Sequence, residues 1–212
     1  MRNLRIWAGT VALLACSGAG AAGVYEDMVR AMELNDERAV AGLLKRGVDV
    51  DMVTPNGDTL LMVAAKEGKP GMVNTILGAK PKVNARNPYG ETALMLAVFH
   101  GHAEIARQLI AQGAEVNHNG WNPLLYATAR NRLDMARLLI GHGAKVNASA
   151  TNGTTALMMA SREGHLAMVL FLLEHGADFT LKNDDGDTAL RLAQGKGWRE
   201  IAETLGKAGA RE

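Results

Sequence analysis

Residues 90–117 read GETALMLAVFHGHAEIARQLIAQGAEVN and contain one complete structural repeat. Thr92 is a hydroxyl residue able to cap a helix, and the residues after it are apolar on nearly every side, which is typical of a helix packed between neighbours. Gly101 breaks that helix. Residues 103–111 then place their apolar side chains on one stripe, which predicts a second helix with one solvent-facing side. Gly113 follows as a helix stop, so the stretch predicts helix, turn and helix.

The opening of this repeat recurs along the chain. Five pentapeptides share the pattern Gly-x-Thr/Asn-x-Leu, and they begin at Gly57, Gly90, Gly120, Gly153 and Gly186. Their spacings are 33, 30, 33 and 33 residues. A second marker keeps the same phase, because Val-Asp or Val-Asn closes successive repeats at Val50, Val83, Val116 and Val146. Two markers in one register predict an array of about six helical pairs, the first of them degenerate.

These markers divide the chain into a leader and a series of repeats. We expect a cleaved signal peptide over residues 1–22. The repeats that follow are assigned to 24–53 (an N-terminal capping repeat), 54–86, 87–117, 118–149 (with a shortened hairpin), 150–182 and 183–212 (a C-terminal capping repeat). The charged residues of both end repeats predict polar outer faces, as the ends of a repeat array require for solubility. We therefore expect a monomer.

The repeat pattern resembles the ankyrin repeat. The resemblance is carried by the repeat length, the Gly-x-Thr-Ala-Leu opening, Gly101-His102 and Gly164-His165 between the helices, and Gly-Ala-x-Val-Asn at the close. It implies an all-α ankyrin-repeat solenoid of helix-loop-helix units of about 33 residues with projecting hairpin loops. The loops and first helices of such a solenoid form a concave face for binding proteins.

Two features depart from the family's pattern. The family usually has a histidine after the leucine of the opening, where it bonds to the loop, whereas Met62, Met95 and Met158 stand there in this chain. We expect that polar tie to be lost and the methionines to pack in the core. In addition, Lys80-Pro81 replaces the Gly-Ala that ends the second helix. A lysine is strained in a left-handed conformation, so we expect a rearranged turn.

The first 22 residues have the features of an export signal. Arg2 and Arg5 precede an apolar run over residues 6–16, and small residues follow. The run is shorter than the roughly 20 residues of a membrane-spanning helix. We expect cleavage near residues 21–23 and a periplasmic protein. The alternative is a membrane-anchored lipoprotein, because residues 13–16, Leu-Leu-Ala-Cys, resemble a lipobox that would be lipidated at Cys16.

Composition and motifs argue against several functions. Lys+Arg 23 against Asp+Glu 22 gives a formal charge of +1, which provides no large basic surface for nucleic acid. A single cysteine cannot form an intramolecular disulfide or a four-thiolate zinc site. His102 and His165 share one repeat position, which favours a structural role over a zinc cluster. The sequence contains no HExxH motif, no Walker-type glycine-rich loop, no GxSxG elbow and no dinucleotide-binding fingerprint. We therefore predict no enzyme activity, no catalytic residue, no cofactor and no metal.

A protein-binding surface follows from the resemblance. Partner-facing positions lie beside the loop glycine and at the exposed end of each first helix. The predicted binding residues are Tyr89, Glu91, Phe99, His100, Trp121, Arg130, Arg162 and Glu163. Three exposed aromatic residues would leave an apolar patch unless a partner covers it. The alternative is that the shortened hairpin folds Trp121 onto Tyr89 as local packing.

The predicted function is therefore a non-enzymatic protein-protein interaction module for an unidentified protein partner, without nucleic-acid binding and without membrane contact unless Cys16 is lipidated. An inhibitor or protective partner of a periplasmic enzyme is a more specific alternative. A lipid-anchored scaffold is another, and a metal-binding protein or enzyme is less well supported.

Overall fold

The computed structural model describes residues 19–211 and divides into two compact units, residues 19–93 and 94–211. Cys16 and the apolar run of the predicted leader lie outside the described residues. The predicted cleavage site falls inside the first helix, α1 (Ala19–Glu33).

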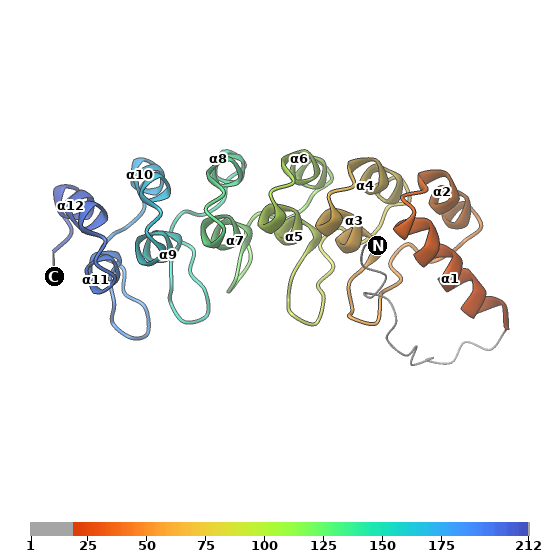
Figure 1. Ribbon diagram of the computed structural model, residues 1–212, viewed down its shortest axis with the longest axis horizontal. Coiled ribbons are helices and arrows are strands. Elements are labelled where there is room, and N and C mark those ends of the chain that lie inside the picture. Colours follow the sequence, from red (N-terminus) through yellow and green to blue (C-terminus); the bar gives the residue numbers. More distant parts are fainter. Residues whose placement is uncertain (1–18, 212) are drawn as a thin grey trace, which may run out of the picture. The chain divides into compact units, whose positions relative to one another are not determined.

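The first unit contains two helical pairs. Its elements are α1 (Ala19–Glu33), α2 (Glu37–Lys45), α3 (Leu60–Glu67) and α4 (Pro70–Leu77). Helix α1 packs on α2, α3 packs on α4, and α2 packs on α4 (Figure 1). The Asp36 side chain accepts the N–H of Ala39 at 3.0 Å and so caps α2. The first pair contributes Met28, Met32 and Val40 to the buried core.

The second unit repeats the same pair four times. Its elements are α5 (Ala93–His100), α6 (Ala103–Ala111), α7 (Pro123–Ala129), α8 (Leu133–Gly141), α9 (Ala156–Glu163), α10 (Leu166–Glu174), α11 (Ala189–Gly195) and α12 (Arg199–Lys207). The first helices of the pairs form one layer and the second helices form the other (Figure 1). The loops before α7, α9 and α11 project from the layer of first helices. The predicted all-α repeat fold is confirmed.

Burial follows the two helix patterns of the sequence. In α5, every residue from Ala93 to Val98 is buried. In α6, Ile105 and Leu109 are buried while Arg107 is exposed. A first helix is therefore surrounded by its neighbours and requires apolar side chains all round, whereas a second helix needs only an apolar stripe.

In two repeats the methionine sulfur accepts a hydrogen bond, where we expected no polar contact from this side chain. The backbone N–H of Thr59 donates to Sδ of Met62 at 3.4 Å, and the N–H of Thr155 donates to Sδ of Met158 at 3.5 Å. In return, each threonine hydroxyl accepts the N–H of the same methionine and caps the helix. The methionines are buried, as predicted, but the expectation that the tie is lost was wrong for these two repeats. A thioether is a weak acceptor that also packs well in a core.

The turn at Lys80 keeps the geometry of the glycine turns. Lys80 has a φ of 56°, in the left-handed region, where Gly113 has 86° and Gly143 has 84°. Its N–H donates to the carbonyl of Leu77 at 3.0 Å, which matches the bond from Gly113 to Ile110. The expected rearrangement is therefore found only in part. The chain keeps the left-handed residue and its hydrogen bond, whereas Pro81 has no N–H for the bond that Ala114 donates to Leu109.

The second sequence marker links one repeat to the next. The Asn117 side chain accepts the N–H of Lys145 at 2.8 Å and donates to the carbonyl of Gly143 at 2.9 Å. Asn147 makes the same two bonds to the following repeat. In the first unit the carboxylate of Asp51 accepts the N–H of Lys82 at 2.8 Å but has no amide to donate. The asparagine at the close of a repeat thus holds the start of the next hairpin in register.

Candidate functional site

An aromatic cluster lies at the ends of α5 and α7 in the second unit. The Trp121 and Tyr126 ring centroids are 5.4 Å apart at an angle of 72°, and the Tyr126 and Phe99 centroids are 5.9 Å apart at 77°. Both are edge-to-face pairs, a favourable geometry for aromatic rings. Cζ of Arg130 lies 4.6 Å from the Phe99 centroid, within cation-π range. We call these four residues, Phe99, Trp121, Tyr126 and Arg130, the aromatic-arginine surface.

The start of α7 fixes the position of Trp121. The Asn122 side chain accepts the N–H of Leu125 at 3.1 Å and caps the helix, and Pro123 occupies the first helical position. Trp121 directly precedes this cap, so its indole lies outside the helix and is 47% exposed. Tyr126, inside the helix, is half-buried beneath it. The indole ring is therefore held in place on one side and open to solvent on another.

The positive charge of Arg130 accompanies the aromatic rings. Arg130 and His100 are exposed, and within residues 19–211 no carboxylate forms an ion pair with Arg130. Nη2 of Arg132 donates to the carbonyl of His100 at 3.4 Å. Arg162 and Glu163, at the end of α9, pair with each other at 2.9 Å, an exposed contact that contributes little to stability. The guanidinium of Arg130 is thus available to a partner.

One repeat position caps the neighbouring first helix. Twelve residues after the repeat glycine, a long donor side chain reaches back to a carbonyl of the preceding repeat. The pairs are Lys69 to Met32 at 2.6 Å, Arg132 to His100 at 3.4 Å, His165 to Thr128 at 3.2 Å and Trp198 to Arg162 at 3.0 Å. Because a carbonyl only accepts, Nδ1 of His165 carries the proton in this contact. These residues satisfy carbonyls at the end of a helix, which leaves His165 with a structural role.

The predicted binding residues fall into two groups. Phe99, His100, Trp121 and Arg130 lie at adjoining repeats of the second unit, with Phe99 half-buried beneath Arg130. Arg162 and Glu163 follow on α9 and are exposed. Tyr89 and Glu91 belong to the first unit. Tyr89 is 81% exposed at its hairpin, whereas Glu91 is half-buried and accepts a hydrogen bond from Nδ2 of Asn87 at 3.0 Å.

Tyr126 joins the site although sequence reasoning did not include it. Six residues after the repeat glycine, the other repeats carry Val63, Leu96, Met159 and Leu192. An aromatic residue in this aliphatic column is the signal that would have identified it. Trp121 packs on Tyr126 of its own repeat, so part of the indole surface is used locally.

Histidine and carboxylate side chains do not gather into a metal centre in the described part of the chain. No three His, Cys, Asp or Glu side chains within residues 19–211 are close enough to hold an ion. His100 and His102 stack with ring centroids 6.0 Å apart. In the acidic loop before α11, the Asn183 side chain accepts the N–H groups of Asp185 and Asp187, which explains its compact turn without a ligand. None of the helices in residues 19–211 has the length and apolar character to span a bilayer.

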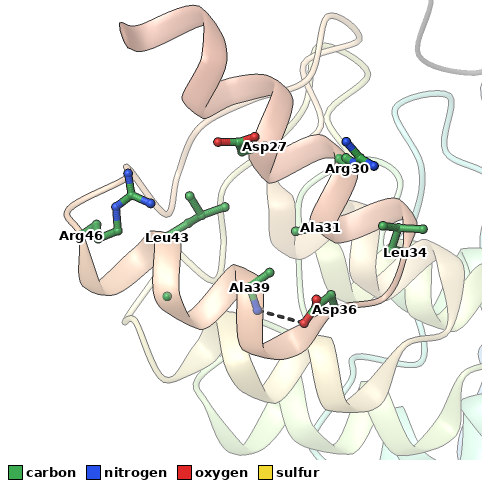
Figure 2. Close-up of a pocket in the computed structure, with 9 residues that line it drawn as sticks. Asp27, Arg30, Ala31, Leu34, Asp36, Ala39, Leu43 and Arg46 are labelled. Carbon is green, nitrogen blue, oxygen red and sulfur yellow. Dashed lines mark hydrogen bonds between the residues drawn. The ribbon is translucent and has the colours of Figure 1, made fainter.

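A groove opens between α1 and α2 in the first unit. It has a volume of about 470 Å³ and contains Leu34, which is 69% exposed, between charged residues of both signs (Figure 2). Asp36, on the rim of the groove, caps α2 because its side chain accepts a hydrogen bond from the N–H of Ala39. Figure 2 shows this bond as a dashed line. None of the predicted binding residues lies in this groove.

Comparison with known proteins supports the repeat assignment. A family model described as ankyrin repeats (three copies) matches residues 28–119, 61–150, 113–183 and 148–211. The matches overlap and together extend from the second half of α1 to the last described residue.

Similar proteins come from animals and bacteria. Ankyrin repeat domain-containing protein 29 of Danio rerio is 40% identical over 55 residues, which cover 26% of this chain and 18% of that protein. Poly [ADP-ribose] polymerase tankyrase of Caenorhabditis elegans is 33% identical over 98 residues, 45% of this chain and 4% of that protein. The putative ankyrin repeat protein YahD of Escherichia coli is 28% identical over 96 residues, 43% of this chain and 48% of that protein. This chain thus spans less than half the length of each of these relatives.

Proposed function

The chain belongs to the ankyrin-repeat family, and on this premise we propose that it is an exported, non-enzymatic module that binds a partner protein through the face formed by its hairpin loops and first helices. Ankyrin repeats are protein-protein interaction modules, so the general class of function follows from the family. The location, the face and the residues are our proposal. The alignment covers only 4% of the tankyrase, so we do not assign the catalytic activity in its name to this chain.

The exposure of Trp121 beside Arg130 is the observation that carries the proposal. Tryptophan and arginine dominate the binding energy of many protein interfaces, especially near the interface centre. An indole that is 47% exposed and held by Tyr126 loses little conformational freedom when a partner covers it. His100, Arg162 and Glu163 supply polar groups around this centre. Tyr89 and Glu91, in the first unit, are also proposed as partner-binding residues.

Capture of the partner with matched variants tests this proposal. The tagged chain is expressed in its native host, cross-linked in the cell envelope and purified, and bound proteins are identified by mass spectrometry. We expect Trp121→Ala to reduce recovery of the partner at least tenfold. Leu170→Ala removes a side chain of similar exposure from α10, in the other helix layer, and is expected to leave recovery unchanged. Equal recovery with both variants, or no protein specific to the wild-type chain, would contradict the proposed face.

Export is proposed from the leader alone, and the mass of the mature protein tests it. Arg2, Arg5 and the apolar run support cleavage near residues 21–23, which predicts a mature chain that begins there. A mass that includes Cys16 with attached lipid would favour the anchored scaffold instead, and an intact Met1 would contradict export. We also propose that the mature protein is a monomer, which sedimentation equilibrium measures directly.

A further inference from the structure

We propose that the aromatic-arginine surface binds an extended, acidic segment of the partner protein, with a carboxylate on Arg130 and an apolar side chain on Trp121. This inference rests on the proposed function and specifies the chemistry of the partner at that site. It is carried by the unpaired charge of Arg130, the exposed indole of Trp121, and the ring contacts through Tyr126 and Phe99 that link them.

The guanidinium of Arg130 lies over an aromatic ring and makes no ion pair. Its Cζ lies over the Phe99 ring, 4.6 Å from the centroid. Arg130 is exposed, and no described carboxylate forms an ion pair with it. The N–H donors of guanidinium lie in its plane and form a fork that matches a carboxylate in bidentate fashion. The cation-π contact with Phe99 restrains the guanidinium near the ring.

The charges around Arg130 favour an acidic ligand. Ten residues after the repeat glycine, the second unit carries His100, Arg130, Glu163 and Lys196. Glu163, the only acidic member, is paired with Arg162 at 2.9 Å. Glu104 and Asp134, four residues after His100 and Arg130, lie in the first turns of α6 and α8, which belong to the other helix layer. Oε2 of Glu115, in the hairpin before Trp121, lies 3.6 Å from Nδ1 of His118. Arg130 therefore contributes a positive charge at this surface that no described carboxylate compensates.

A preference for cations at helix C-termini explains part of this pattern but not all of it. Arg130 is the C-cap of α7, where its positive charge interacts favourably with the helix dipole. That effect does not require an exposed tryptophan nearby. The combination of cation, stacked phenylalanine and exposed indole is found within this one cluster, and it fits a ligand that is both acidic and apolar.

The dimensions of the surface limit the length of the ligand segment. Successive centres from Trp121 to Tyr126, Phe99 and Arg130 are separated by 5.4, 5.9 and 4.6 Å, and these steps together set an upper limit on the span from the indole to the guanidinium. Because an extended chain advances about 3.3 Å per residue, a segment of at most about five residues covers this span. The ligand thus needs an apolar side chain and a carboxylate a few residues apart.

Selection from a random peptide library tests the inference without knowledge of the natural partner. Phage displaying random dodecamers are panned on the purified chain, and the selected peptides are synthesised and titrated by fluorescence anisotropy. We expect selected sequences to contain Asp or Glu within five residues of Leu, Ile or Phe. Replacing that Asp or Glu by its amide should weaken binding at least tenfold. Added salt should also weaken binding, because it screens the interaction between the peptide carboxylate and Arg130.

Variants of the chain locate the binding site. Arg130→Gln and Trp121→Ala should each weaken binding at least tenfold, and Arg130→Lys, which keeps the charge but not the fork, should give an intermediate loss. Arg137→Gln is the matched control, because Cζ of Arg137 lies 4.7 Å from the Phe171 centroid in a similar contact at the second helices, and it should change binding less than twofold. Circular dichroism checks that each variant remains folded.

The possible results separate this inference from the proposed function. Peptides that depend on Trp121 but contain no enrichment in acidic residues would overturn the inference and leave the protein-binding face intact. Peptides that bind Trp121→Ala and Arg130→Gln as tightly as the wild-type chain would overturn both, as would a selection that yields no binder. A 20-nucleotide oligo(dT) that binds in a Trp121-dependent manner would also overturn the inference, because stacked bases would then explain the aromatic and arginine side chains.

Discussion

Lys80 has a backbone conformation that glycine adopts at the matching position of the other repeats. Its φ of 56° is costly for a residue with a Cβ, and its side chain is exposed and makes no compensating contact within its own unit in the described structure. Lys80→Gly should therefore raise the free energy of unfolding by about 0.5–1 kcal/mol, the strain relieved being partly offset by the greater freedom of glycine in the unfolded chain. Urea denaturation measures the change.

Asn131→Gly is the control for that substitution. Asn131 has a φ of 50°, but asparagine enters the left-handed region more readily than lysine, so the expected change is near zero. A decrease in stability for Lys80→Gly, or equal gains for both variants, would show that the Lys80 turn is not strained.

Two hydrogen bonds from Thr180 affect the ionisation of Asp178. Hydrogen bonds from the Thr180 hydroxyl at 2.6 Å and the Thr180 N–H at 2.8 Å stabilise the carboxylate and lower the pKa of Asp178 below its ordinary value. A lowered folded-state pKa contributes stability that is fully present above the pKa of the unfolded chain and is lost as the pH falls through the folded-state value. Thr180→Val should raise the pKa of Asp178, and Thr180→Ser should preserve it. Carboxyl NMR titration distinguishes these results, and an unchanged value in Thr180→Val would assign the shift to the backbone N–H alone.

At the scale of the helix and hairpin, Asn147 connects two successive repeats. It accepts the N–H of Asp178 at 2.8 Å and donates to the carbonyl of Gly176 at 3.2 Å. Asn147→Ala removes both bonds, and we expect the free energy of unfolding to fall by about 1–2 kcal/mol. Asn119→Ala, at an exposed loop position, should stay within about 0.5 kcal/mol of the wild-type value. Equal effects in urea denaturation would contradict a linking role for Asn147.

The elements themselves could be predicted from the sequence because their signals are local. Gly101 lies between α5 and α6 as expected, and Gly113 follows α6 with a positive φ. The partners of side chains between repeats could not be predicted in this way. Lys69, Arg132 and Trp198 have no common chemistry except a long donor, and their shared acceptor, a carbonyl of the preceding repeat, becomes evident only when the helices are stacked.

The site shows the same division between local and long-range information. The exposure of Trp121 follows from its place before the helix cap, which the repeat register predicts. The contact of Arg130 with Phe99 depends on two repeats lying side by side, and so does the contact of Tyr126 with Phe99. The Met62 and Met158 contacts to the backbone depend on side-chain conformation, which the sequence pattern does not specify.

At the scale of the whole molecule, the stability of the array should depend on how many neighbours each repeat has. Leu139 in α8 and Leu205 in α12 occupy equivalent positions and are both 0% exposed, so Leu→Ala removes the same buried group from each. Each substitution should cost about 2–5 kcal/mol locally. The α7 and α8 pair contacts neighbours on both sides, whereas α11 and α12 contact only α9 and α10 among the described helices of the unit. Stability in such arrays is a sum of repeat and interface contributions.

The two substitutions should consequently produce different unfolding behaviour. Leu139→Ala weakens a repeat on which both of its neighbours depend, so it should lower the midpoint of the main urea transition. Leu205→Ala should instead release α11 and α12 in a separate early transition while α7 to α10 stay folded. Hydrogen exchange resolved by segment checks this, because amides of α11 and α12 should then exchange well before those of α9. A single transition with the same midpoint for both variants would mean that the second unit unfolds all at once, and that its end repeat is stabilised as strongly as an interior one.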